Sequence, residues 1–313
     1  MSARLIMKLR VASARLTTPD VLHLSFIHPS RPELPAWTPG AHVDLRTASG
    51  KIRQYSLCGD PADRAHYEIA IKREDAGRGG SVWAHANLDV GAEAHVSAPR
   101  NNFPLRENAH RHILIGGGIG VTPMLAMAHG LVATNQDFEL HFCARSEKEA
   151  PMLAEAKAIC GDRLQLWLST SGRRFDPGQL GPVRDGVHIY ACGPQRLLDA
   201  VRAAAAGWPD EQIHAEVFQA TLDENFKAEP FDIMLASTGA VLHVPADRSL
   251  LAVLRDHGIQ MPSSCELGVC GSCVCGYRDG VVIHRDVVIP LGARQDRMAP
   301  CVSRARVSVT LDL

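Results

Sequence analysis

The chain has 313 residues and a mass of 33.9 kDa; 46% of the residues are hydrophobic and 21% are charged. At about 100 to 200 residues per domain this length predicts two or three domains, and the composition is that of a folded globular protein rather than a disordered or fibrous one. The 33 basic and 34 acidic side chains leave a net charge of -1, which gives no electrostatic reason to expect a nucleic acid or membrane partner.

The chain begins with residues 1–11, which carry Arg4, Lys8 and Arg10 and lack an apolar stretch long enough for a secretory signal. We therefore expect a cytoplasmic protein. The sequence contains nine cysteines. Because the glutathione pool of the cytosol keeps such thiols reduced, structural disulfides are not expected.

Residues 1–104 alternate short apolar runs with turns that contain Pro or Gly. Within the runs, apolar side chains recur at every second position. This pattern predicts an antiparallel barrel or a sandwich. The clearest predicted strands are residues 21–26, 41–45, 67–71 and 94–97.

Two motifs in this first region suit a cofactor with a planar ring and a phosphate. The sequence Arg53-Gln54-Tyr55-Ser56 stands at a strand end, and residues 77–83 form a glycine-rich turn that opens a short helix. Free amides at the helix start can bind a phosphate, with Arg53 as its countercharge. Tyr55 can then lie on the ring, and Ser56 can offer its hydroxyl to a ring nitrogen. The alternative is an ordinary barrel with a glycine turn on its surface.

From about residue 112 the pattern changes, because continuous apolar strands now alternate with helical stretches. This alternation predicts an α/β domain with a parallel sheet. The predicted strands are residues 112–115, 138–143, 164–169 and 188–191. The predicted helices are residues 122–134, 147–160 and 195–206.

A glycine loop lies at the start of this second region. Residues 113–124 are predicted to form a strand, a tight loop and a helix with Pro123 in its first turn, where a missing N–H costs nothing. A pyrophosphate is favoured at such a helix start. Val121 stands where the G-x-G-x-x-G pattern has its third glycine, and the next strand ends at Arg145-Ser146 with no carboxylate at its tip. A standard Rossmann site therefore does not follow from the pattern alone.

A third region follows a polar stretch. Residues 220–230 show neither a helical nor a strand period and end in Pro230, so they are interpreted as a linker. Beyond it, residues 247–258 place Leu250, Leu251 and Leu254 on one helical face, with Gly258 as a stop signal and strands on either side.

The most specific motif of the chain lies in this third region. Cys265, Cys270 and Cys273 fit the pattern C-x4-C-x2-C, and Cys301 follows after 27 intervening residues. Four thiolates at this spacing suit a 2Fe-2S cluster, with three ligands on one loop and the fourth from a strand. A structural zinc site is the alternative, but zinc usually takes two pairs of closely spaced ligands.

Neighbouring residues fit the cluster interpretation. Gly268 and Gly271 let the ligand loop turn tightly and leave amides free to point at the sulfurs, which stabilises a negatively charged cluster. Cys275 falls outside the ligand pattern, and we interpret it as a small buried thiol beside the cluster.

The motifs together resemble the phthalate dioxygenase reductase family, including vanillate demethylase reductase subunits, over essentially the whole chain. Residues 231–313 are similar to a plant-type ferredoxin at all four cysteines. The R-x-Y-S strand and the glycine-serine turn resemble the flavin-binding barrel of ferredoxin reductases. Residues 117–123, Gly-Gly-Ile-Gly-Val-Thr-Pro, and the later Cys192-Gly193-Pro194 resemble the nucleotide-binding part of the same enzymes.

The resemblance implies a multidomain fold. Its parts are an antiparallel Greek-key β-barrel for the flavin, an α/β domain with a parallel sheet for NAD, and an α+β, β-grasp-like ferredoxin. We place the barrel at residues 1–104, the NAD domain at 105–222, a linker at 223–230 and the ferredoxin at 231–313.

The resemblance also assigns site residues. Flavin contacts fall on Arg53, Tyr55, Ser56, Ala70, Ile71, Lys72, Gly79, Gly80 and Ser81. Nucleotide contacts fall on Gly118, Gly120, Thr122, Pro123, Arg145, Ser146, Cys192, Gly193 and Pro194. Metal ligands are Cys265, Cys270, Cys273 and Cys301.

Three of the implied residues have roles in hydride transfer. Ser56 would bond the flavin N5 edge, Cys192 would sit beside the nicotinamide, and Phe218 would cover the exposed flavin face until the nicotinamide displaces it. Phe226 is a second candidate for that cover, although an aromatic residue in a polar linker is more often an anchor. Cys192 is not expected to be a covalent nucleophile, since no histidine is positioned by sequence as its base.

The implied activity is that of an NADH-dependent reductase component that passes electrons through FMN to a 2Fe-2S cluster and on to a terminal oxygenase. FMN rather than FAD is implied by the position of the ferredoxin after the other two domains. The expected partner is a Rieske-type aromatic oxygenase or O-demethylase. The alternatives are a haem monooxygenase as partner, or a non-turnover iron-sulfur carrier or redox sensor.

Residues 231–313 carry eight acidic and eight basic side chains, so docking to the oxygenase is expected to rely more on shape than on charge steering. We expect a monomer with no nucleic acid or membrane partner.

Overall fold

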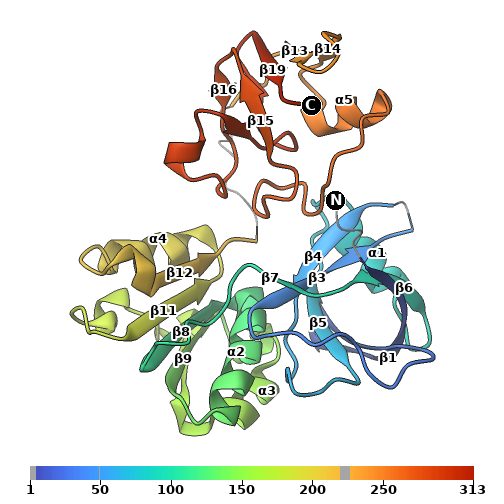
Figure 1. Ribbon diagram of the computed structural model, residues 1–313. Helices are drawn as coiled ribbons and strands as arrows, with labels where there is room; N and C mark the ends of the chain where they lie inside the picture. The colour runs from blue at the N-terminus through green and yellow to red at the C-terminus, as the bar shows by residue number, and fades with distance from the viewer. Residues whose placement is uncertain (1–4, 49, 219–225) are drawn as a thin grey trace. The chain divides into compact units, whose positions relative to one another are not determined.

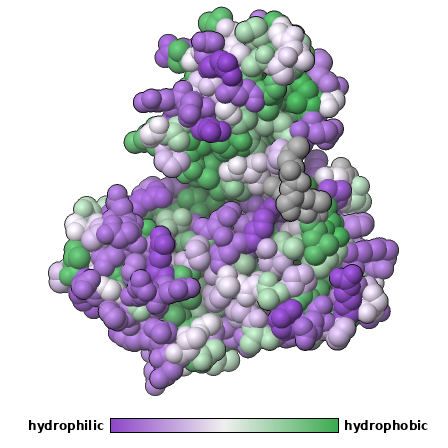
Figure 2. Space-filling model, viewed as in Figure 1, coloured by the Kyte–Doolittle hydropathy of each residue, from purple (hydrophilic) through white to green (hydrophobic). Residues whose placement is uncertain are grey.

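The computed structural model describes residues 5–48, 50–218 and 226–313. The chain divides into two compact units, Met1–Glu216 and Val217–Leu313 (Figure 1). Hydrophilic side chains cover much of the visible surface of each unit (Figure 2). None of the helices in the described ranges is long and apolar enough to cross a membrane.

The first unit begins with a barrel (Figure 1). Its strands form one sheet in the order β4-β3-β6-β1-β2-β5, with β7 beside β3. A bridge between Leu57 and Ile69 joins the two ends of this order and closes the sheet. The elements are β1 (Ile6–Thr18), β2 (Val21–Ile27), β3 (Ala41–Arg46), β4 (Ile52–Ser56), β5 (Tyr67–Lys72), α1 (Gly80–Asn87), β6 (Glu93–Ser97) and β7 (Arg100–Asn101). The predicted antiparallel barrel is confirmed, and all four predicted strands are present.

The second half of this unit is a parallel sheet in the order β10-β9-β8-β11-β12. The apolar side chains of its three central strands are buried, as expected for a parallel sheet with helices packed against it. The strands are β8 (Arg111–Gly117), β9 (Asp137–Ala144), β10 (Leu164–Leu168), β11 (Val187–Cys192) and β12 (Ile213–Glu216). The helices are α2 (Val121–Ala133), α3 (Leu153–Cys160) and α4 (Gln195–Ala204).

The barrel and the parallel sheet share contacts. A Cβ atom on Gly130 of α2 would lie 2.6 Å from Pro39 Cγ, so this glycine lets the helix approach the barrel. Phe103 packs edge to face on Tyr190 of β11, with 5.7 Å between the ring centroids. These contacts explain why both parts fall in one compact unit, and the predicted boundary at residue 104 stays a prediction.

The second unit is the predicted α+β, β-grasp-like fold. Its main sheet has the order β14-β13-β19-β15-β17, in which β13 and β19 are parallel and the other pairs are antiparallel. Leu250, Val253 and Leu254 of α5 pack into the core of this sheet. The elements are β13 (Phe231–Leu235), β14 (Val241–Val244), α5 (Leu250–Asp256), β15 (Cys275–Arg278), β16 (Val282–Ile283), β17 (Arg297–Met298), β18 (Arg304–Ala305) and β19 (Ser308–Leu311).

Some predicted boundaries were wrong. The helix predicted at residues 147–160 begins only at Leu153, because Pro151 and the left-handed Met152 (φ 55°) interrupt it. The sequence places the end of the first unit's last strand at residues 216–218, but the strand ends at Glu216. The helix predicted at residues 247–258 spans Leu250–Asp256, because Ser249 caps its start by accepting a hydrogen bond from the Ala252 amide at 3.2 Å.

Short 3-10 turns occur between the main elements. They are η1 (Gly118–Gly120), η2 (Glu147–Glu149), η3 (Gly161–Arg163), η4 (Ser169–Ser171), η5 (Pro177–Leu180), η6 (Asp210–Gln212) and η7 (Leu291–Ala293). Of the predicted linker, residues 226–230 are described, and residues 223–225 lie outside the described ranges. The buried Arg304 guanidinium donates to the Glu229 carbonyl at 2.8 Å, which fastens the end of the linker to the second unit.

Candidate redox sites

The glycine-serine turn forms an anion site at the start of α1. Gly79 adopts a left-handed conformation (φ 80°) at the helix N-cap, and within the described residues no side chain caps the helix there. A Cβ atom on Gly80 would lie 2.7 Å from Arg53 Nε, so the guanidinium lies against the helix start. Open amides beside a cation suit a phosphate, as the sequence predicted.

The residues that are expected near the flavin ring lie on the strands β4 and β5 of the barrel. Tyr55 is half-buried against the barrel core, and burial raises the pKa of its phenol to about 12, so the ring stays neutral. The side chains of Ala70 and Ile71 are buried, which leaves only their backbone for a ligand. The Ile71 carbonyl accepts a hydrogen bond from Nε2 of His85 at 2.8 Å.

Two further side chains of this region have partners within the chain. Lys72 forms an ion pair with Glu74 at 3.0 Å, and the Ser81 hydroxyl accepts a hydrogen bond from the Glu74 amide at 3.0 Å. Glu74 thus fastens the glycine turn to the end of β5. The turn is held in place by the chain itself, which preorganises the anion site.

Ser56 and Cys192 meet a carboxylate that the sequence analysis missed. The Ser56 hydroxyl on β4 donates to Glu216 Oε2 on β12 at 3.4 Å, and Glu216 is the residue that pairs with Cys192 across β11 and β12. Burial raises the pKa of Glu216 to about 7, while the hydrogen bond from Ser56 opposes the rise. The site therefore contains a carboxyl group that exchanges a proton near neutral pH.

The proton held by Glu216 makes the stability of this unit depend on pH. An exposed glutamate has a pKa of about 4.3, so between that value and about 7 the folded state keeps a proton that the unfolded state has lost. The free energy of unfolding is expected to fall as the pH rises through this window, by at most about 1.4 kcal/mol per pH unit. Urea unfolding of the parent protein and of Glu216→Gln at several pH values checks this. The unfolding free energy of the variant should not fall with pH in this window. If it fell as steeply as that of the parent protein, the assignment to Glu216 would be contradicted.

The glycine loop packs on the Cys-Gly-Pro segment. A Cβ atom on Gly120 would lie 2.3 Å from the Cys192 carbonyl oxygen, and one on Gly117 would lie 2.8 Å from Pro194 Cδ. The two motifs, about seventy residues apart, therefore form one surface at the carboxyl ends of β8 and β11, where parallel sheets bind ligands. Gly118 has φ 54° and open space beside it. The loop thus leaves room for a nucleotide.

The residues around the loop are placed as predicted, with one addition. Pro123 lies in the first turn of α2, and the buried Thr122 donates to the Ile119 carbonyl at 3.0 Å. At the end of β9, Glu149 accepts a hydrogen bond from the Ser146 hydroxyl at 3.0 Å and lies 3.6 Å from Arg145. The strand tip therefore has a nearby carboxylate, supplied by the turn that follows it.

Cys192 is fully buried, and its pKa is raised well above the ordinary value, first by burial and then by the charge of Glu216. A neutral, buried thiol is no nucleophile, in agreement with the sequence analysis. Phe218 is half-buried and belongs to the second unit, so its contact with the flavin stays a prediction. Phe226 is an anchor within its own unit, because the Arg285 guanidinium lies 4.1 Å from its ring centroid.

The four predicted metal ligands form two pairs. The thiols of Cys265 and Cys270 act on each other, which lowers the pKa of Cys270 and raises that of Cys265. Cys273 and Cys301 likewise shift each other's pKa, and both pack in one cluster with Leu251, Ile289 and Ala299. No three of the described side chains converge so as to hold a single metal ion. Two pairs of sulfurs are the arrangement that a two-iron centre needs.

Backbone amides point at these sulfurs. The Leu267 amide donates to Cys265 Sγ at 3.3 Å, and nearby backbone amides help to lower the pKa of Cys270. Gly268 and Gly271 have φ values of 74° and 69°, which glycine adopts without strain. Amide donors of this kind stabilise a negatively charged cluster, so the residues present fit a 2Fe-2S group.

Comparison with known proteins agrees with this geometry. A family profile described as a 2Fe-2S iron-sulfur cluster binding domain matches residues 233–306. A vanillate O-demethylase oxidoreductase from Pseudomonas sp. strain HR199 is 39% identical, over 97% of this chain and 98% of the relative. The β subunit of a heme-dependent oxidative N-demethylase from Ectopseudomonas mendocina is 40% identical, over 98% of this chain and 99% of the relative.

A solved structure has the same architecture. It is a phthalate dioxygenase reductase, described as a modular structure for electron transfer from pyridine nucleotides to [2Fe-2S]. It matches with a TM-score of 0.83 and 35% identity, over 98% of each chain.

Proposed function

The chain belongs to the phthalate dioxygenase reductase family, and from this premise we propose that it takes electrons from NADH and delivers them through FMN and a 2Fe-2S cluster to a terminal oxygenase. It is an oxidoreductase. The observation that carries the proposal is the 2Fe-2S domain matched at residues 233–306, in which Cys265, Cys270 and Cys273 share one loop and Cys301 packs in one cluster with Cys273. We further propose that the protein is a cytoplasmic monomer with the predicted domain boundaries.

Each step of the relay has residues to support it. A bound flavin would accept two electrons from NADH and pass them one at a time to the 2Fe-2S cluster. The glycine loop and the segment from Cys192 to Pro194 hold the nucleotide, while Arg53 and the start of α1 hold the flavin phosphate. We expect the Ser56 oxygen at the flavin N5 edge, with its hydroxyl proton directed to Glu216. Hydride transfer itself needs no acid or base, so these residues act by position and electrostatics.

The proposed partner is a Rieske-type aromatic oxygenase or O-demethylase. The vanillate O-demethylase relative supports it. A haem-dependent partner is the second candidate, and the heme-dependent N-demethylase subunit favours it at almost the same identity. Co-purification of the native partner, followed by its absorption spectrum, distinguishes the two.

The released flavin is expected to be FMN. The ferredoxin follows the other two domains, and the structure supports a single phosphate turn from Gly79 to Ser81. Chromatography of flavin extracted by heat checks this prediction. FAD as the main species would be the opposite result.

NADH is expected to bleach the bound flavin with a higher kcat/KM than NADPH. Glu149 at the tip of β9 can accept a hydrogen bond from a ribose 2'-hydroxyl and repels a 2'-phosphate, although Arg145 beside it can bind that phosphate. Steady-state kinetics with both nucleotides test the preference, and equal kcat/KM values would count against it. A flavin that neither nucleotide bleaches would instead indicate a non-turnover carrier or sensor.

A further inference from the structure

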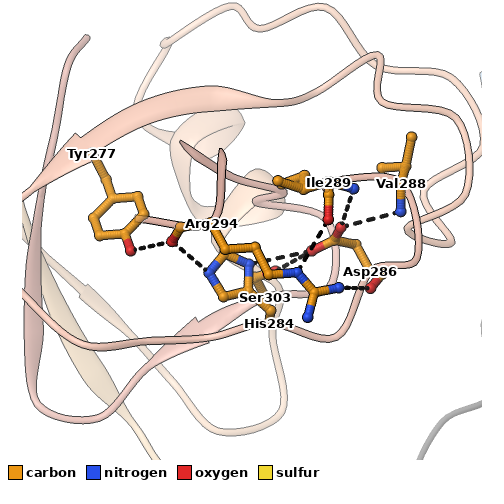
Figure 3. A network of polar contacts seen from close by, with 7 residues as sticks. All are labelled: Tyr277, His284, Asp286, Val288, Ile289, Arg294 and Ser303. Atoms are coloured by element: carbon orange, nitrogen blue, oxygen red, sulfur yellow. Dashed lines mark hydrogen bonds and ion pairs between the residues drawn. The ribbon is translucent and has the colours of Figure 1, made fainter. Parts of the chain in front are cut away.

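A network of polar contacts surrounds Asp286 in the second unit (Figure 3). Its residues occupy the segment between β16 and β17, together with Tyr277 on β15 and Ser303 before β18. Apart from η7 this segment has no helix or strand to pair its backbone. Side chains supply many of its hydrogen bonds, and several of these hold the segment against its neighbours.

Asp286 is the centre of the network. Its side chain is buried, and a buried carboxylate is unfavourable unless hydrogen bonds satisfy it. Oδ1 accepts from the amides of Val288 at 3.3 Å and Ile289 at 2.9 Å, and Oδ2 accepts from the Ser303 hydroxyl at 3.4 Å. One carboxylate thus joins the 286–289 segment to the strand that follows Cys301.

The same segment packs directly on the first cysteine loop. The Val287 amide donates to the Gly268 carbonyl at 3.0 Å. A Cβ atom on Gly268 would lie 3.1 Å from Asp286 Cα and 2.7 Å from Val302 Cγ2, so the two segments are in contact. Gly268 lies on the loop between the ligands Cys265 and Cys270, and Val302 directly follows the ligand Cys301. The segment of Asp286 therefore packs where the ligand loop meets the fourth ligand's turn.

Arg294 holds the other end of this segment in place. The Arg294 guanidinium donates to the carbonyls of Ile289 and Asp286, both at 3.1 Å. The Arg294 carbonyl accepts from the Tyr277 hydroxyl at 2.7 Å and from Nε2 of His284 at 3.0 Å. The segment is therefore clamped at both ends, and its position relative to Gly268 is set by side chains.

We propose that Asp286 is a positioning residue for the 2Fe-2S cluster, holding its own segment against the ligand loop at Gly268 and against the turn of Cys301 through its two carboxylate oxygens. The inference rests on the cluster assigned under the proposed function. What acts is the acceptor geometry of Asp286: its oxygens accept from two amides and a hydroxyl, and His284 Nδ1 lies 3.5 Å from Oδ2.

The test compares Asp286→Ala with Asp286→Asn in the full chain. Both variants remove the charge, but asparagine keeps an acceptor oxygen for the amides of Val288 and Ile289. The matched control is Asp296→Ala, which removes an exposed carboxylate from the same unit. Visible circular dichroism and electron paramagnetic resonance report the cluster's surroundings, and a chelator challenge reports how fast its absorbance is lost.

Asp286→Ala is expected to change both spectra and to lose the cluster about tenfold faster or more, as for other residues that support metal ligands. Asp286→Asn and Asp296→Ala should keep parental spectra and retention. An alanine variant that never holds a cluster, beside an asparagine variant that does, supports the proposal equally. Parental behaviour of Asp286→Ala, or equal damage in both Asp286 variants, would overturn it. A parent protein without cluster absorbance would overturn the proposed function, and this inference with it.

Discussion

Replacing Cys270 by Ser is expected to abolish the 2Fe-2S cluster. A hydroxyl is a harder and far less acidic ligand than a thiolate, so one iron would lose half of its cysteine ligands. The effect should be large because the two irons need all four cysteines to complete their ligand set. Iron content and visible absorbance measure the loss.

Cys275→Ser is the matched control for this variant. Cys275 lies on β15, is buried, and has its pKa raised to about 12 by that burial, so it is a neutral thiol outside the two pairs. The variant Cys275→Ser should therefore keep its full iron content. The ligand assignment fails if Cys275→Ser loses the cluster while Cys270→Ser keeps it.

Gly120→Ala is expected to lower kcat/KM for NADH by about 100-fold or more. The added methyl would lie 2.3 Å from the carbonyl oxygen of Cys192 and 2.5 Å from its carbon, and backbone cannot give way as a flexible side chain does. The loop must move from the Cys-Gly-Pro segment, and a misplacement of about 1 Å is enough to cost about 100-fold in rate. Steady-state kinetics with NADH measure the effect.

The control for this change is Gly207→Ala, since a Cβ atom there meets nothing within 4 Å. Both variants should keep their flavin and should be reduced normally by dithionite, because neither residue lies in the barrel. An unchanged kcat/KM in Gly120→Ala would show that the contact between the two motifs does not position the nucleotide.

The ligands and loops of this protein were predictable because each depends on local chemistry. The spacing of Cys265, Cys270 and Cys273 is that of one loop, and the glycines before Thr122 indicate a tight turn that precedes a helix. The structure confirms both, together with the barrel and the parallel sheet that carry the flavin and nucleotide motifs.

Residues that act through long-range contacts were missed. Glu216 is an ordinary strand residue in the sequence, and only the pairing of β11 with β12 and the approach of β4 place it between Cys192 and Ser56. Glu149 lies in a stretch that the sequence predicted as helix, so its hydrogen bond with Ser146 just after β9 could not be predicted. Asp286 has no sequence signal, because its role depends on the packing of its segment against Gly268.

The most direct test of the relay from nucleotide through flavin to cluster uses Cys270→Ser with two electron acceptors. The flavin and nucleotide motifs lie before residue 217, in a unit separate from the cysteine pairs, so their folding should survive the change. With NADH the variant should still reduce ferricyanide, taking electrons from the flavin, while turnover of the co-purified oxygenase should collapse. Oxygenase turnover near the parental level with the cluster absorbance gone would contradict the relay and leave the ferredoxin unit as a docking module only.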